Sequence, residues 1–302
     1  MARARANGIE IEYEDSGPRD GPVVLLIMGL GAQLVRWPAT MVDGLVARGY
    51  RVVRYDNRDV GLSTKFDDRG VPSILWTAMQ RQFGREPAVP YSLTDMAQDA
   101  VGLLDALSID RAHVVGASMG GMIAQLVASR WPERVETLCS IMSTTGHPTC
   151  SRPTMRATAL LLRHPRNDDI EAIVAHGTLA GRAVGGKFPI EDALMAERIR
   201  DEVLRNHCPT GFLRQMAAII ADGDRTERLR RIVASTLVIH GSDDPLVPPE
   251  GGRQTARAIP GARLLEIEGM GHTLPPQVIA PIVDAIDSHA RAEPLPAVAR
   301  AA

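Results

Sequence analysis

The fold is decided by residues 112–130, which read AHVVGASMGGMIAQLVASR. The apolar run 112–116 predicts a buried strand, and the segment 119–130 predicts a helix. Ser118 lies in the turn between them, with one glycine two residues before it and another two residues after it. Such a sharp turn strains its central residue and leaves no room for side chains at the two glycine positions. The stretch therefore predicts a nucleophilic serine at the end of a strand.

The residues around Ser118 favour a nucleophile turn over a phosphate-binding glycine loop. Gly116 and Gly120 meet the steric need of the turn, and Gly121 is expected to add slack. The alternative is a phosphate-binding glycine loop, but that pattern needs a lysine directly before the hydroxyl residue, where this chain has Ala117. The start of the following helix would aim its amides and its positive dipole end at the hydroxyl.

Strand and helix patterns alternate on both sides of this stretch. Ile9–Tyr13 alternates with the period of an edge strand. Further strands are predicted at 23–28, 51–56, 135–142, 236–240 and 262–267, and helices at 38–48, 93–107 and 276–291. One block has helical patterns alone, at 155–163, 170–179, 190–206 and 212–221.

Repeated strand–helix units predict an α/β fold, a mostly parallel sheet with helices on both faces. The helical block is expected to form a lid over the carboxyl edge of that sheet, where open α/β sheets bind ligands. The predicted division is a core at 1–143 and 232–291, a lid at 144–231 and a tail at 292–302.

Composition excludes several function classes. The net charge of −2 over 302 residues gives no electrostatic case for binding nucleic acid. The longest apolar run, Val23–Met28, is too short to cross a membrane, and no apolar core follows the basic N-terminus as in a secretory signal. Three scattered cysteines show no metal-ligand spacing. We expect a cytoplasmic protein with a small-molecule substrate and with no metal or cofactor; the sequence indicates no oligomeric state.

A nucleophilic serine needs a base that is itself held in place. His272 lies in a glycine-rich loop just after the last predicted strand and is the expected base. Asp243 and Asp244 are adjacent after an earlier strand, and Asp244 is favoured as the acid because Pro245 stiffens the chain directly after it. Asp243 would then be a turn former. The segment 140–145 contains no carboxylate, which excludes an acid there.

Two backbone amides are expected to stabilise the negative charge that develops during acyl transfer. Met119 directly follows the serine, and its N–H is the first candidate. The second candidate is the N–H of Leu30, since glycines on both sides of Leu30 allow its amide to face inward.

Five motifs occur together in a fixed order. They are 28–31 (MGLG), 55–63 (YDNRDVGLS), 116–121 (GASMGG), 241–245 (GSDDP) and 269–272 (GMGH). Over nearly the whole chain outside the lid, they resemble the α/β-hydrolase fold family. The 56–63 stretch and the ending Met-Gly-His-x-Leu-Pro resemble the serine carboxylesterase branch that contains aclacinomycin methylesterase, and macrolide esterases look similar. Met28 departs from the many relatives with histidine there, which is usually structural.

The combined prediction is a serine-dependent carboxylic ester hydrolase. A lid rich in leucine and methionine predicts a wide apolar pocket for a bulky ester or lactone, such as a polyketide or a macrolide. An enol-lactonase, a carbon–carbon bond hydrolase and a perhydrolase would use the same three residues. A ligand receptor built on the same fold is the alternative that is not an enzyme.

Overall fold

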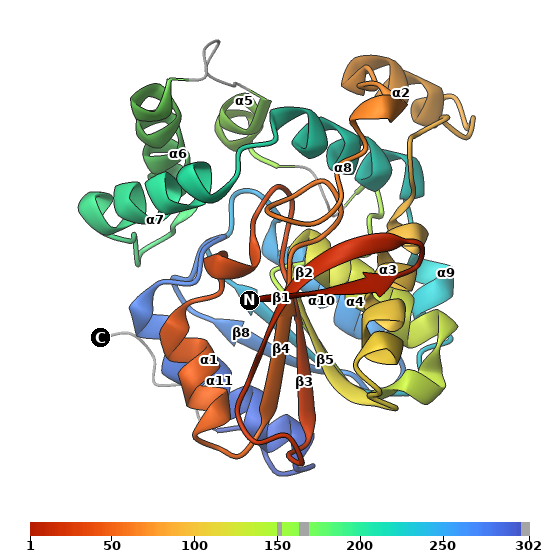
Figure 1. Ribbon diagram of the computed structural model, residues 1–302, viewed down its shortest axis with the longest axis vertical. Helices are drawn as coiled ribbons and strands as arrows, with labels where there is room; N and C mark the ends of the chain where they lie inside the picture. Colours follow the sequence, from red (N-terminus) through yellow and green to blue (C-terminus); the bar gives the residue numbers. More distant parts are fainter. Residues whose placement is uncertain (150–152, 163–168, 297–302) are drawn as a thin grey trace.

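A computed structural model describes residues 1–149, 153–162 and 169–296 of the chain. Arg163, the last residue of one predicted helix, and residues 297–302 of the predicted tail lie outside these ranges. The predicted α/β class is confirmed, because the described strands form one sheet with helices packed around it (Figure 1). The strands are β1 (Ala2–Ala6), β2 (Ile9–Ser16), β3 (Val23–Ile27), β4 (Arg51–Tyr55), β5 (Ala112–Ala117), β6 (Val135–Ile141), β7 (Ser235–Gly241) and β8 (Arg263–Ile267).

The sheet has the strand order β1-β2-β4-β3-β5-β6-β7-β8. Strands β3 to β8 all run parallel to one another, whereas β1 and β2 run antiparallel to their neighbours. The expectation that Ile9–Tyr13 is an edge strand is wrong, because β1 lies outside it with Ala4 opposite Ile11. Alternating alanine and arginine in β1 carry too little apolar contrast to signal a strand.

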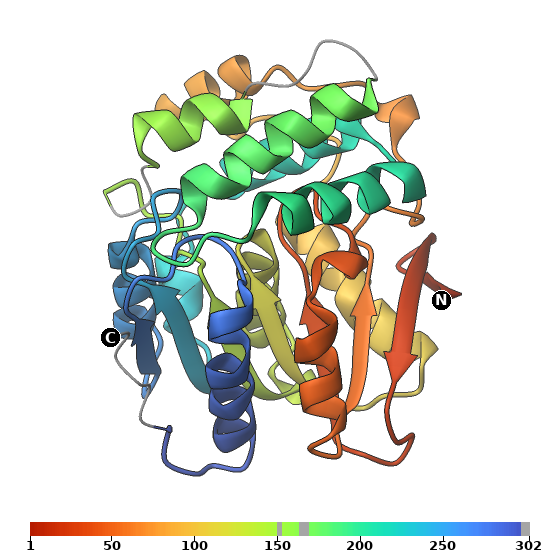
Figure 2. The same ribbon diagram turned by 90° about the vertical axis from the view of Figure 1, so that its left-hand side faces the viewer.

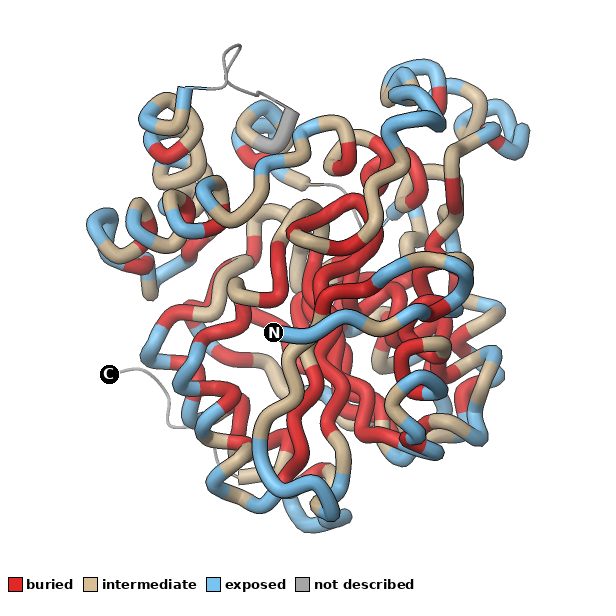
Figure 3. The backbone as a smooth tube through the Cα atoms, in the orientation of Figure 1, coloured by how far each residue is buried: buried red, intermediate tan, exposed pale blue. Residues whose placement is uncertain are grey.

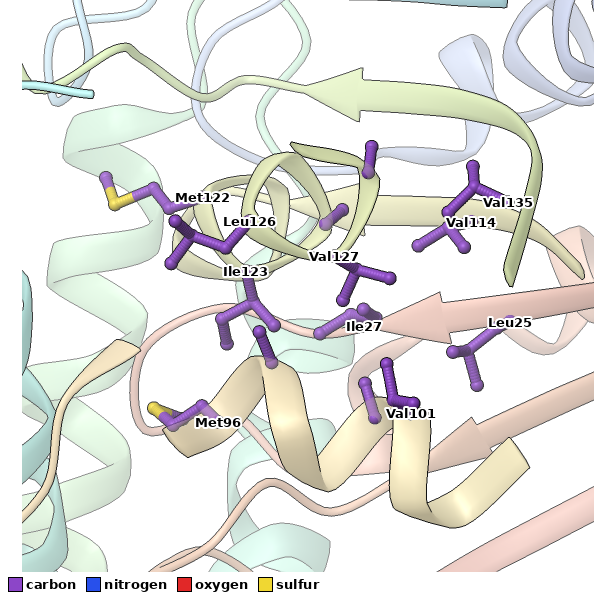
Figure 4. Close-up of a cluster of buried hydrophobic side chains, with 14 of the residues drawn as sticks. Leu25, Ile27, Met96, Val101, Val114, Met122, Ile123, Leu126, Val127 and Val135 are labelled. Atoms are coloured by element: carbon purple, nitrogen blue, oxygen red, sulfur yellow. The ribbon is translucent and has the colours of Figure 1, made fainter. Parts of the chain in front are cut away.

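The central strands are buried on both faces, as their continuous apolar runs predict. In β3, Leu25 and Ile27 enter one core cluster, whereas Val24 and Leu26 enter the cluster on the opposite face. Figure 4 shows the first cluster, in which strand side chains meet Met96 and other residues of two helices. Each fully buried aliphatic side chain contributes about 1.5–3 kcal/mol, so this doubly covered sheet is the stable base of the molecule.

Helices cover each face of the sheet. One face is packed by α1 (Ala39–Val46) and α11 (Pro276–Ala290). The other is packed by α3 (Leu93–Ala106), α4 (Met119–Arg130) and α10 (Pro249–Ala258), with α9 (Thr226–Leu229) against α4 and α10. Ser92 and Asp95 form a capping box that fixes the start of α3. Short 3-10 turns occur at Leu34–Arg36, Asp67–Arg69 and Pro132–Arg134.

Four helices between β6 and β7, here called the cover, lie across the end of the sheet at which the parallel strands finish (Figure 2). They are α5 (Met155–Leu162), α6 (Ile170–Val184), α7 (Asp192–Arg205) and α8 (Pro209–Asp222). All four predicted helices are found there, although α6 continues to Val184 instead of ending at Leu179. The helix runs through Gly181, where the missing side chain leaves room for Met195 of α7.

A further helix, α2 (Ile74–Gln82), has no counterpart in the predicted elements and packs against α8. Its only buried residue is Thr77, and Leu75, Trp76 and Met79 are exposed. Apolar residues recur at helical spacing in α2, but most of them face solvent, so the helix presents no apolar stripe to the core. Figure 3 shows α2 as a largely exposed element beside the cover. Within the described part of the chain, no helix is both long and apolar enough to span a membrane.

Candidate active site

Ser118 occupies the turn between β5 and α4 in a strained backbone conformation, with φ 57° and ψ −120°. A Cβ atom at Gly116 would lie 2.1 Å from the Gly120 carbonyl oxygen, and one at Gly120 would lie 2.0 Å from the carbonyl oxygen of Ile27. Both contacts are with backbone, which has no room to move. The turn therefore requires glycine at both positions, as its sterics predict. The backbone of β3 imposes the constraint at Gly120, and the turn itself imposes it at Gly116.

Gly121 does not provide the slack expected from the sequence. A Cβ atom there would lie 2.6 Å from the Cβ atom of Ser143, in the chain that follows β6. The absent side chain lets α4 pack closely against that segment. Gly121 is therefore a packing requirement, which no pattern within the turn reveals.

The structure brings His272 and Asp244 to Ser118. Nε2 of His272 lies 2.9 Å from Oγ of Ser118, and Nδ1 of His272 lies 2.6 Å from Oδ2 of Asp244. The histidine lies in the loop after β8, and its backbone N–H donates to the Val184 carbonyl at the end of α6, at 2.6 Å. Serine, imidazole and carboxylate thus form one continuous hydrogen-bonded line, the geometry in which a base takes a hydroxyl proton.

The two adjacent aspartates have different surroundings. Asp244 is buried, and its Oδ1 accepts hydrogen bonds from the backbone N–H groups of Leu246 (2.9 Å) and Val247 (2.8 Å). These bonds leave Oδ2 for His272. Asp243 is exposed, and its Oδ1 accepts from the hydroxyl of Ser242 at 2.7 Å. Only Asp244 therefore contacts the imidazole.

A second histidine, His240, lies beside the same carboxylate. Its Nε2 is 3.6 Å from Oδ2 of Asp244 and donates to the Val247 carbonyl at 2.9 Å. Burial lowers the pKa of His240, which keeps the ring neutral. The sequence places His240 at the end of a strand as a core histidine, and its closeness to the acid depends on how the following turn folds back.

The loop after β3 approaches the serine closely. A Cβ atom at Gly29 would lie 3.1 Å from the Cβ atom of Ser118, so a side chain there would crowd the site. Leu30 follows in this loop and lines the same pocket as Ser118. Met119 is the first residue of α4, and N–H groups of a first helical turn have no carbonyl partner within the helix. Both residues expected to supply oxyanion amides therefore border the serine.

Asn57 holds the start of this loop. Its Nδ2 donates to the Met28 carbonyl at 2.9 Å, and its side chain is buried. Asn57 belongs to the 55–63 motif, to which the sequence assigns no function beyond family likeness. Its contact gives that motif a local role, which is to support the loop beside Ser118.

A pocket of about 920 Å³ opens onto Ser118 and His272. Its walls come from the sheet edge, from the cover and from α2, and six methionines lie among the lining residues: Met28, Met119, Met122, Met142, Met195 and Met216. Ala78 and Arg81 of α2 also line it. No helix is predicted from the sequence at 74–82, so the contribution of α2 to the pocket comes from the structure alone.

The pocket also holds positive charge. Arg36 pairs with the buried carboxylate of Glu202, and Arg198 lines the wall nearby. Burial, followed by the charge of Arg36, lowers the pKa of Arg198. Among the residues the structure describes, no three His, Cys, Asp or Glu side chains gather in a way that would hold a metal ion.

Comparison with known proteins gives the family. A family model described as "alpha/beta hydrolase fold" matches residues 22–276. Rhodomycin D methylesterase DauP of Streptomyces sp. (strain C5) is 33% identical over 297 residues, which cover 91% of this chain and 92% of the methylesterase. Rhodomycin D methylesterase DnrP of Streptomyces peucetius is 32% identical over the same share of each chain.

Solved structures agree with this result. The enol-lactonase of Burkholderia xenovorans LB400 is similar with a TM-score of 0.66 and 26% identity, covering 90% of this chain and 93% of the lactonase. A meta-cleavage product hydrolase of Pseudomonas fluorescens IP01 has a TM-score of 0.73 at 21% identity, covering 97% and 98%, and shows likeness of fold alone. The motifs, the sheet and these comparisons together show that the chain belongs to the α/β-hydrolase family.

Proposed function

We propose that the protein is a serine-dependent carboxylic ester hydrolase that works through an acyl-enzyme on Ser118. The observation that carries this proposal is the line from Ser118 Oγ to His272 (2.9 Å) and from His272 to Asp244 (2.6 Å). Family membership and the likeness to curated methylesterases over most of the chain support an ester-acting hydrolase.

The proposed chemistry has two halves. His272 takes the hydroxyl proton while Ser118 Oγ bonds to the ester carbonyl carbon, and the N–H groups of Leu30 and Met119 stabilise the resulting oxyanion. The intermediate collapses, and the alcohol leaves with the proton held by His272. A water then gives a proton to His272 as it attacks the acyl carbon, and the second intermediate collapses: the bond to Ser118 Oγ breaks, His272 returns the proton to Oγ and the acid is released, while Asp244 orients the imidazole throughout.

We also propose that the substrate is a bulky ester, of the polyketide or macrolide kind. A pocket of about 920 Å³ is near the upper end of the usual range for small-molecule sites. Its methionine side chains adapt to irregular shapes. Two relatives above 30% identity are named methylesterases of rhodomycin D, which adds support for a large substrate.

The division into a core at 1–143 and 232–291 and a lid at 144–231 is part of the proposal. Support comes from the position of the cover above the sheet edge and from its residues in the pocket wall. Within the proposed lid, α9 packs against α4 and α10, so this short helix is attached to the core.

Hydrolysis of a cyclic ester is the second candidate, and the 26% identity to a solved enol-lactonase favours it. The first step on Ser118 would be the same, but the alcohol would stay attached to the acyl group. Comparing kcat/KM for a lactone with that for its open-chain methyl ester separates the two. Stable binding of either without turnover would instead indicate a receptor.

Replacing Ser118 with alanine tests the mechanism. With p-nitrophenyl acetate and butyrate, Ser118→Ala is expected to lower kcat by at least about 10³-fold, since the nucleophile is gone. Ser129→Ala, which changes a serine of α4 outside the pocket lining, is the matched control and should keep wild-type turnover. Turnover retained by Ser118→Ala would overturn the proposed function.

A further inference from the structure

The loop that carries Leu30 is a tight turn with a defined geometry. The N–H of Ala32 donates to the Gly29 carbonyl at 3.3 Å, and Gly31 has a φ of +66°. A glycine with positive φ at the third of four positions is the pattern of a type II turn. The planar peptide between Leu30 and Gly31 is the middle of this turn, and the peptide directly before it carries the N–H of Leu30.

One side chain holds this peptide. The N–H of Gly31 donates to Oε1 of Gln215 at 2.8 Å. Gln215 belongs to α8 in the cover, and its side chain is fully buried. Its Nε2 donates to the Arg58 carbonyl at 2.8 Å. The side-chain amide of Gln215 therefore makes two hydrogen bonds: its oxygen accepts from Gly31, and its nitrogen donates to Arg58.

The two contacts require glutamine chemistry. Gly31 offers an N–H and needs an acceptor, whereas Arg58 offers a carbonyl and needs a donor. A methionine of similar length provides neither, and an ionised glutamate provides no donor. The backbone of α8 at this point is held separately, because Arg214 makes two hydrogen bonds to the buried Asp59.

We propose that Gln215 is a positioning residue of the oxyanion hole: by holding the Gly31 amide it fixes the turn from Gly29 to Ala32, and so keeps the preceding Gly29–Leu30 peptide, which carries the N–H of Leu30, aimed at the carbonyl oxygen of the substrate. The inference rests on the proposed function, since it needs Leu30 as an oxyanion donor. It also makes α8 part of the catalytic apparatus, although no atom of Gln215 contacts the reacting groups in this scheme.

The test uses Gln215→Met in the full-length protein with p-nitrophenyl butyrate. If the N–H of Leu30 is no longer held in place, its hydrogen bond to the oxyanion weakens. Because that bond forms mainly in the transition state, kcat should fall about 10-fold and KM should stay within about twofold. A trifluoromethyl ketone, which forms a tetrahedral adduct with the serine, should bind about 10-fold more weakly. The corresponding alcohol, which forms no oxyanion, should bind unchanged.

Gln33→Met is the matched control. Gln33 is another buried glutamine between core and cover, and its Nε2 donates to the carbonyls of Glu202 (2.6 Å) and Asn206 (2.7 Å). It contacts α7 and not Gly31, and it does not line the pocket. If Gln33→Met lowers kcat and trifluoromethyl ketone binding as much as Gln215→Met does, attachment of the cover explains the effect and the proposal is overturned.

Gln215→Glu keeps the experiment decisive if the methionine variant fails to fold. A protonated glutamic acid has one acceptor and one donor, as glutamine does, and full burial at this position favours that neutral form. Relative to wild type, its kcat should be highest at the acid end of the active pH range. If the kcat of Gln215→Glu relative to that of wild type does not rise toward acid pH, the proposal is overturned.

Failure of this inference is distinguishable from failure of the proposed function. If wild type is active, Ser118→Ala is inactive and Gln215→Met matches wild type, only the positioning role is wrong. If wild type hydrolyses no ester, or Ser118→Ala keeps its turnover, the proposed function is wrong and the role of Gln215 is overturned with it.

Discussion

The sheet edge and the cover form opposite walls of one pocket, and they are held by different means. At the edge, Gly116 and Gly120 bring backbone against backbone at distances that exclude even one methyl group. Within the cover, α6 approaches α7 at Gly181, and the contact there is with the flexible end of Met195. The edge is therefore fixed by the chain itself, whereas the packing of α6 on α7 depends on a side chain that adapts.

The cover is attached to the core in part by buried polar contacts. These join α7 and α8 to the loops after β3 and β4. Arg205 donates to Asp56 at 2.6 Å, and Arg214 donates to Asp59 at 2.8 Å. Asp56 and Asp59 are fully buried, so each needs its arginine. The proposed chemistry at the edge and the proposed substrate choice in the cover are thus coupled where the cover contacts the site, at Gln215 and at the Val184 carbonyl that accepts from His272.

The largest expected effect is at the edge. Asp244→Asn should lower kcat by about 10⁴-fold, because an amide no longer fixes the tautomer and the charge of His272. Asp243→Asn changes the neighbouring exposed carboxylate and should leave kcat within about twofold of wild type. Steady-state kinetics on one p-nitrophenyl ester measure both. Equal losses in the two variants would show that the turn, and not the contact with His272, matters.

The next effect is on the attachment of the cover. Arg214→Leu leaves the buried carboxylate of Asp59 without its arginine counter-charge and should cost about 3–5 kcal/mol of unfolding free energy. Denaturant titration followed by circular dichroism measures this loss. Arg200→Leu removes an exposed pair between two cover helices, Arg200 with Glu171, and should leave the denaturation midpoint unchanged. A neutral result for Arg214→Leu would mean that the cover is held by its apolar contacts.

A pair of glycine substitutions compares the two walls directly. Gly120→Ala forces β3 and the serine turn apart and should cost about 1–3 kcal/mol while also lowering kcat. Gly181→Ala meets only the end of Met195, and alanine favours the helix, so stability should be unchanged or slightly increased. Thermal melts and kcat on the same ester measure both. The reverse order of stabilities would reject the contrast between a rigid edge and an adaptable cover.

The smallest effect concerns substrate choice. Met216 of α8 lines the pocket, and Met216→Phe should lower kcat/KM for a bulky polyketide methyl ester by about 10-fold, since a stiff ring replaces an adaptable chain. The rate on p-nitrophenyl acetate should stay within about twofold, because the small acyl group does not reach the cover. A uniform loss on both esters would place Met216 at the reacting centre instead.

Parts of this molecule were predictable because their signals are local. The parallel strands show as apolar runs, and residues 112–130 contain the whole strand, turn and helix around Ser118. The loops with Leu30 and His272 follow predicted strands and carry their own glycines. By contrast, α2 has no buried stripe, and β1 has alanines where a strand signal needs larger apolar residues. Helix α2 packs against α8, which is distant in the sequence, whereas β1 pairs with the adjacent β2 and packs against the distant α3.

The sequence by itself determined the sheet, the serine turn and the set of candidate residues, because strand periodicity and turn sterics act over a few neighbouring residues. Only the tertiary structure decided which partners meet across the fold. His272 reaches Ser118 across 154 residues of chain, and Gln215 reaches Gly31 across 184. Contacts over such separations leave no periodic pattern, since they arise when the cover folds back over the edge and every buried polar group must find a partner.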